Sequence, residues 1–156
     1  MSKSLKRVRR ALEDAGLEPN ILEMEAETRT AAQAAEAAGC ELDQIAKSII
    51  FRGETSGAAI LFLTAGGNQV DATKAADLAG EPLGKADAAL VRAQTGFAIG
   101  GVAPVGHLSP IRAFLDPRLM EFDTVWAAAG TPRHIFEISP KTLETLTSAT
   151  LAEFTS

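Results

Sequence analysis

Apolar residues recur along the chain at two different periods, and these periods predict where helices and strands lie. Leu5, Val8 and Leu12 follow the three-to-four-residue spacing of a helix, and Gly16 stands where such a helix ends. Capping residues and glycine stops predict further helices over residues 31–38, 73–79, 87–94 and 141–147, with one or two more helical turns at 41–46. In the first of these, Thr30 and Gln33 have the spacing of a capping box.

Short apolar runs bounded by turn residues predict strands over residues 21–26, 47–52, 58–63, 111–115, 124–129 and 135–138. The turns at 53–57 and 130–133 are too short for parallel crossovers, so each is expected to join a hairpin. Short strands interleaved with short helices predict an α+β fold: a mixed, mostly antiparallel, barrel-like sheet surrounded by short helices. A chain of 156 residues is expected to form a single domain over residues 1–156.

Charge narrows the classes of protein that this chain can represent. The formal net charge is −5, which argues against a general polyanion binder. The first ten residues nevertheless hold a third of all the basic residues, namely Lys3, Lys6, Arg7, Arg9 and Arg10. This cluster is either the solvated side of a helix or a contact to phosphates. No apolar run could span a bilayer, no signal-peptide pattern is present, and a single cysteine cannot form an internal disulfide, so a cytoplasmic protein is expected.

Residues 94–107 read Q-T-G-F-A-I-G-G-V-A-P-V-G-H and are the most informative stretch of the chain. Glycine allows the backbone to approach other groups closely and to adopt positive φ angles. The stretch is therefore either a sharp corner between two strands or a loop whose free N–H groups bind an anion or an oxygen that gains negative charge.

Lys47 lies where a helical segment meets an apolar strand. Its ammonium either reaches out to solvent along the protein surface or stands beside a ligand with three donors. His107 and His134 have no ligand partner at metal-site spacing, so neither a metal site nor a cofactor is predicted. A conventional covalent hydrolase is also not expected, because the chain has no G-x-S-x-G elbow and no Walker lysine.

Four segments together resemble one family, the YbaK/prolyl-tRNA synthetase-associated editing domains. They are the lysine-bearing strand (residues 46–51), the next helix (70–76), the loop that is similar to T-G-[FY]-x-x-G-G-[VI]-x-P-x-G (95–107), and the strand and glycine turn that close the site (122–130). The resemblance extends from about Met24 to about Leu146. Each motif alone is modest, but four in register are specific.

The resemblance implies a deacylase that hydrolyses the ester of mischarged tRNA, in particular tRNA(Pro) carrying Cys, Ala or another small amino acid. It implies backbone stabilisation of the oxyanion and help from substrate groups, with no cofactor or metal. Its catalytic residues would be Lys47, Gly100 and Gly101. Its substrate-binding residues would be Thr95, Gly96, Phe97, Pro104, Gly106, His107 and Gly130.

The implied partners are the tRNA 3′ acceptor end and, as a further candidate, prolyl-tRNA synthetase, with no membrane. One departure concerns specificity: residues 133–136 read R-H-I-F, without the aspartate that the Cys-specific branch has there, which favours another small amino acid. Trp126 lies in an apolar strand and is expected in the core, so weak intrinsic tRNA affinity is expected. The alternative function is a non-catalytic tRNA- or synthetase-binding module of the same fold.

Overall fold

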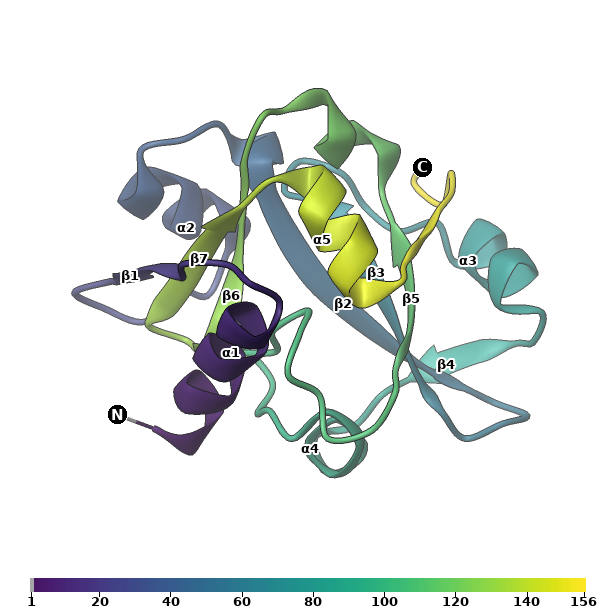
Figure 1. Cartoon of the computed structure of the whole chain (residues 1–156). Coiled ribbons are helices and arrows are strands. Elements are labelled where there is room, and N and C mark those ends of the chain that lie inside the picture. The colour runs from purple at the N-terminus through teal and green to yellow at the C-terminus, as the bar shows by residue number, and fades with distance from the viewer. Residues whose placement is uncertain (1) are drawn as a thin grey trace.

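The computed structural model describes residues 2–156, which form one eight-stranded mixed sheet and five α-helices (Figure 1). The α-helices are α1 (Lys3–Asp14), α2 (Ala31–Ala38), α3 (Ala72–Ala79), α4 (Ala88–Thr95) and α5 (Pro140–Thr147), and two short 3₁₀ helices are η1 (Leu42–Gln44) and η2 (Pro117–Glu121). The strands are β1 (Asn20–Glu23), β2 (Ile45–Gly53), β3 (Ala59–Ala65), β4 (Leu83–Lys85), β5 (Arg112–Leu115), β6 (Val125–Thr131), β7 (His134–Ile138) and β8 (Thr150–Leu151).

The strand order is β1-β7-β6-β2-β3-β5-β8, with β4 pairing to β2 beside this path. Four strand pairs are antiparallel and three are parallel. The predicted hairpins are present as β2–β3 and β6–β7. The predicted α+β class with a mixed sheet is therefore confirmed, and within residues 2–156 the two end strands β1 and β8 do not pair with each other.

The helix boundaries follow the capping residues seen in the sequence. Thr30 accepts a hydrogen bond from Gln33 N at 3.1 Å, and Asp87 and Ser139 cap α4 and α5 in the same way. The capping box at α2 is shifted by one residue, because the Gln33 side chain accepts from Arg29 N and not from Thr30 N.

The helical turns predicted at residues 41–46 are wrong beyond Gln44. Ile45 and Ala46 instead begin β2, since they pair with Trp126 and Ala127 of β6. The sequence also did not predict β4 and β8, whose three and two residues are too short to show a period.

A small apolar cluster joins α2 to the start of β2, and two others fill the interior on opposite sides of β3. The larger one receives Leu5, Val8 and Leu12 from α1. The smaller one centres on Phe62 of β3, whose ring centroid lies 5.0–5.7 Å from those of three other phenylalanines, Phe51, Phe114 and Phe154. Every residue of β3 is buried, because helices and loops cover both of its faces. No helix within residues 2–156 has the length and apolar character to cross a bilayer.

Phe62→Ala is expected to lower the free energy of unfolding by about 3–5 kcal/mol, because it leaves a cavity between three aromatic rings. Urea denaturation followed by circular dichroism measures this loss. Leu151→Ala, at a side chain that is 45% exposed, is the matched control and should cost less than about 0.5 kcal/mol. Equal effects of the two substitutions would contradict this account of the core.

Candidate functional site

A cavity of about 240 Å³ opens where strands β2 and β6 separate. The two strands pair only at Ile45–Trp126 and Ala46–Ala127. On the same edge of β2, the next strand partner within residues 2–156 is β4, which begins to pair at Phe51. Residues 47–50 therefore have no strand partner on this edge, and residues 45–49 line the cavity. Unpaired strand edges offer backbone groups to a ligand.

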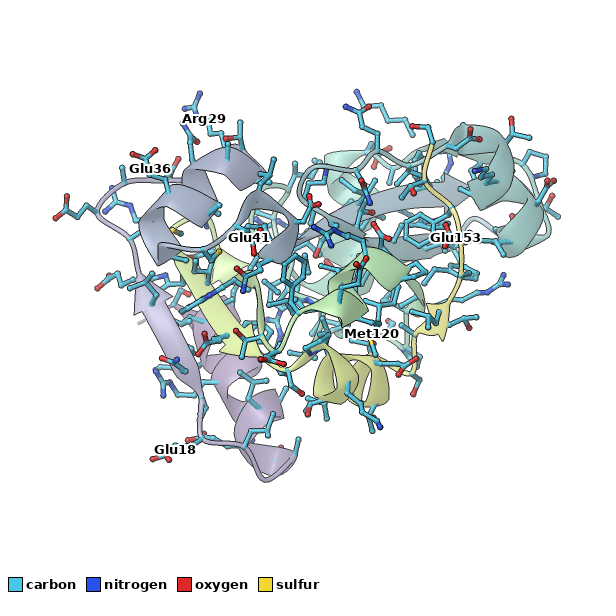
Figure 2. All side chains as sticks on the ribbon, turned by 90° about the horizontal axis from the view of Figure 1, so that it is seen from above. Glu18, Arg29, Glu36, Glu41, Met120 and Glu153 are labelled. Carbon is cyan, nitrogen blue, oxygen red and sulfur yellow. The ribbon has the colours of Figure 1, made fainter. Side chains whose placement is uncertain are left out.

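The remaining walls come from four other parts of the fold. Residues 28–31 and Ala34, at the start of α2, cover one side. Gly100 and Val102 of the glycine-rich loop, residues 126–128 of β6 and Ile135 of β7 complete the lining. Arg29, one of the lining residues, is exposed, and its side chain extends from this end of α2 into solvent (Figure 2).

Lys47 is one of the residues that line this cavity, and its side chain does not simply reach out to solvent. Its Nζ donates a hydrogen bond to the carbonyl oxygen of Asn68 at 2.6 Å, which leaves two of its three N–H donors for a ligand. Burial lowers the pKa of Lys47, and the carboxylates of Asp116 and Asp43 act in the opposite direction. The amine is thus a partly desolvated cation whose position is set by a backbone carbonyl.

The two central loop glycines have different environments. Gly100 lines the cavity at φ +95°, and within residues 2–156 its N–H has no hydrogen-bond partner. The Gly101 N–H donates to Ala98 O at 3.1 Å, and a Cβ at Gly101 would lie 2.9 Å from Thr131 Cα. Gly101 therefore lets the loop pack against β6, while Gly100 presents a free donor at the cavity that Lys47 also lines.

A model of the aminoacyl-tRNA editing domain family matches residues 25–146, a range that contains every residue lining this cavity. The chain belongs to this family. It is 37% identical over 140 residues to the uncharacterized protein YwhH of Bacillus subtilis (strain 168). The aligned residues make up 90% of this chain and 88% of YwhH.

Two solved structures show the same editing-domain fold. One is a proposed trans-editing enzyme for prolyl-tRNA synthetase, with a TM-score of 0.93 and 48% identity over 100% of this chain and 99% of that chain. The other is the protein APE2540, with a TM-score of 0.87 and 29% identity over 96% of this chain and 99% of that chain. The resemblance deduced from the sequence motifs is confirmed.

Several residues predicted to bind substrate in this editing domain lie outside the cavity lining and position the loop instead. Arg7 of α1 donates from Nη2 to Gly96 O at 2.8 Å and from Nε to Gly106 O at 3.0 Å, and its guanidinium lies 4.6 Å from the Phe97 ring centre. A Cβ at Gly130 would lie 2.9 Å from Ser4 O. Gly96, Phe97, Gly106 and Gly130 therefore fasten the loop and β6 to α1.

Thr95 is also placed away from the cavity lining. Its side chain is fully buried, its Oγ1 donates to Val91 O at 2.6 Å, and it accepts from Phe97 N at 3.1 Å. These bonds fix the turn that leads from α4 into the loop.

Pro104 and His107 line a second, separate cavity of about 440 Å³ together with residues 108–111 and 146–148. His107 Nε2 lies 2.7 Å from Ala103 O, and burial lowers the pKa of His107. The structure thus places Lys47 and Gly100 at one cavity and Pro104 and His107 at another.

Sequence reasoning missed most residues of the main cavity, and three of them are Ser48, Trp126 and Ile135. Ser48 follows Lys47, and its Oγ is buried without a hydrogen-bond partner within residues 2–156. Trp126, expected in the core, is only partly buried and forms one wall. Ile135 forms another. A hydroxyl beside a lysine in an apolar strand was the available signal for Ser48, whereas the other two depend on how β6 and β7 pair. Residues 2–156 hold no group of three or more His, Cys, Asp or Glu side chains placed for a metal ion.

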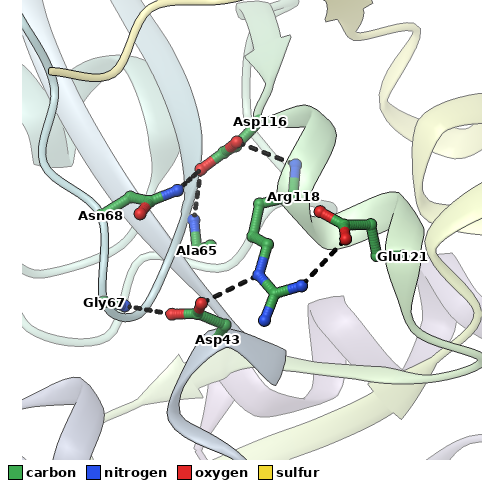
Figure 3. A network of polar contacts seen from close by, with 7 residues as sticks. All are labelled: Asp43, Ala65, Gly67, Asn68, Asp116, Arg118 and Glu121. Carbon is green, nitrogen blue, oxygen red and sulfur yellow. Dashed lines mark hydrogen bonds and ion pairs between the residues drawn. The ribbon is translucent and has the colours of Figure 1, made fainter.

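A polar network behind Lys47 fixes the loop that carries its acceptor (Figure 3). Asp116, 2% exposed, accepts from Asn68 Nδ2 at 3.0 Å, Ala65 N at 3.1 Å and Arg118 N at 3.0 Å. Arg118 Nε donates to Asp43 at 2.9 Å, and Asp43 accepts from Gly67 N at 2.8 Å. The network holds residues 65–68 from both sides, and therefore also the Asn68 carbonyl.

Asp116→Asn is expected to lower the pKa of Lys47 further, because it removes a negative charge that favours the protonated amine. NMR titration of the Lys47 side chain measures the shift. Glu121→Gln is the control: it removes the exposed partner of Arg118 but should leave the Lys47 pKa unchanged. A pKa that stays the same or rises in Asp116→Asn would contradict the coupling.

Proposed function

We propose that this protein is an aminoacyl-tRNA deacylase that hydrolyses the ester between a small amino acid and the 3′ end of a mischarged tRNA. Membership of the editing-domain family supports this proposal, and likeness to a proposed trans-editing enzyme for prolyl-tRNA synthetase favours tRNA(Pro) as the carrier. The observation that carries it is the shared cavity: Lys47 and Gly100, whose N–H is free within residues 2–156, line the same space between β2 and β6.

These groups suit ester hydrolysis. Water adds to the ester carbonyl, the bond from that carbon to the ribose oxygen breaks, and a proton goes to the leaving oxygen to restore the terminal hydroxyl. Negative charge develops on the carbonyl oxygen, and the Gly100 N–H is a donor that could stabilise it without rearrangement. The two remaining N–H donors of Lys47 serve to hold the terminal phosphate or to orient the aminoacyl group.

The cavity walls favour a small apolar side chain on the amino acid. Ala34, Ala128, Ile135 and Val102 are among the lining residues, and none offers a polar partner from its side chain. Ile135 belongs to the stretch in which the Cys-specific branch carries an aspartate. Alanine or 2-aminobutyrate is therefore proposed ahead of cysteine, although one methylene changes discrimination by only about 1–3 kcal/mol.

Ser48 is proposed as a substrate-binding residue. A buried hydroxyl without an internal partner is costly, and a polar group of the bound ester would satisfy it. Ser48 follows Lys47 on the unpaired edge of β2, where both residues line the cavity although their side chains point to opposite faces of the strand.

One observation favours the alternative of a non-catalytic tRNA- or synthetase-binding module. Within residues 2–156, the lining contains no His, Cys, Asp or Glu side chain that could act as nucleophile or general base. Deacylation then requires the substrate to contribute a group, for which the terminal ribose hydroxyl is the proposed candidate. A protein that binds tRNA but hydrolyses no ester would match the alternative.

Lys47→Met and Lys47→Ala are expected to lower kcat/KM for deacylation by about 100-fold or more, because the cavity loses its cation. The melting temperature should change by no more than about 3 °C. The assay follows release of alanine, 2-aminobutyrate, cysteine and serine from the corresponding charged tRNA(Pro). Lys74→Met, at an exposed lysine of α3, is the control. Wild-type turnover in both Lys47 variants would remove this lysine from the mechanism, and no turnover by the native protein on any substrate would overturn the proposed activity.

Ser48→Ala is expected to lower kcat/KM about tenfold while leaving the free energy of unfolding unchanged or slightly increased, since the hydroxyl has no internal partner to lose. Single-turnover deacylation and urea denaturation measure the two quantities. Thr64→Ala, which removes a buried hydroxyl bonded to Phe62 O, is the contrast: it should cost stability. Unchanged kcat/KM in Ser48→Ala would exclude Ser48 from substrate binding.

A further inference from the structure

We propose that the exposed basic face of α1 binds phosphates of the tRNA strand that leads into the cavity. This proposal rests on the proposed function for the identity of the nucleic acid, but it requires no catalysis. Three cations form the face: Lys3, Lys6 and Arg10, all exposed.

The spacing of these cations separates them from the buried side of the helix. Residues 3, 6 and 10 share one face of α1, and the core residues Leu5, Val8 and Leu12 lie on the opposite face. From Lys3 to Arg10 the helix rises about 10 Å, a length suited to two or three successive phosphates. Glu13 and Asp14 follow in the last turn and limit the basic face to the first part of α1.

The distribution of charge makes this face unusual for the chain. The first ten residues contain five basic residues and no acidic one, whereas the rest of the chain contains ten basic and twenty acidic residues. A polyanion is therefore repelled by the protein as a whole and attracted at α1. Such a local field steers and orients a nucleic acid, because charge sets the direction of approach.

The face begins close to the cavity that contains Lys47 and Gly100. A Cβ at Gly130 would meet Ser4 O of α1 at 2.9 Å, and a Cβ at Gly101 would meet Thr131 at 2.9 Å. The start of α1 and the glycine loop thus pack against two consecutive residues of β6. Arg7 adds hydrogen bonds from α1 to both ends of the loop, so α1 is fastened to the segment that carries Gly100.

Acidic residues near the start of α1 indicate the path of the strand. Glu23 and Glu27 line a depression beside Ser2 and Leu5. Arg133 also lines this depression. Phosphates in this depression would face two carboxylates. The strand is therefore expected to follow the solvent-facing side of α1, where Lys3, Lys6 and Arg10 are exposed.

The test compares two triple variants that remove the same charge. Lys3→Gln/Lys6→Gln/Arg10→Gln removes the basic face, and Lys85→Gln/Arg92→Gln/Lys141→Gln removes three exposed cations from β4, α4 and α5. Fluorescence anisotropy with uncharged tRNA(Pro) at several salt concentrations gives the affinity and its salt dependence. The α1 variant should bind at least about tenfold more weakly, and the slope of log K against log salt should fall by about 2–3. The control variant should resemble the native protein.

Equal affinities and slopes for the two variants would overturn the proposal. Deacylation of an aminoacylated CCA trinucleotide separates it from the proposed function, because so short a substrate does not reach the whole of α1. The α1 variant should retain native turnover on the trinucleotide and lose it on full-length tRNA. If the native protein hydrolyses neither substrate, the proposed activity fails, while the anisotropy measurement still decides the role of α1. Thermal unfolding verifies that both variants are folded.

Discussion

Strand β2 is paired along one edge over nearly its whole length and along the other edge only at its two ends. β6 pairs with Ile45 and Ala46, β4 pairs from Phe51 to Gly53, and the interval between them opens into the cavity. Because β3 continues to hold the opposite edge, the strand stays extended across this gap. Lys47 is the first residue beyond the split, so the same break in pairing that creates the cavity also brings Lys47 into its lining.

The polar groups of the site are held by partners that lie outside the cavity. The Asn68 carbonyl positions the Lys47 ammonium, and buried Asp116 in turn holds Asn68. On the other side, Arg7 binds two carbonyls of the glycine-rich loop and leaves Gly100 at the cavity. Such support is what a preorganised site requires, because a donor that is already aimed needs little rearrangement when charge develops.

Elements with strong local signals were predictable from the sequence. The α2 boundaries follow from Thr30 and Gly39, and the two hairpins follow from short turns that cannot form crossovers. The order of the strands was not predictable, since β2 meets β6 across some eighty residues of intervening chain and only two residue pairs. The helical turns expected at 41–46 failed for the same reason: pairing with β6 takes Ile45 and Ala46 into the sheet.

The site shows the same division. The sequence by itself determined that a lysine begins an apolar strand, that a glycine-rich loop carries free backbone groups, and that positive charge gathers at one end of an acidic chain. Only the tertiary structure decided that Gly100 and Lys47 line one cavity, that Arg7 contacts Gly96, Phe97 and Gly106, and that His107 belongs to a different cavity. Glycine and apolar residues are equally suited to a packed corner and to a binding loop, so their role depends on which distant segment packs against them.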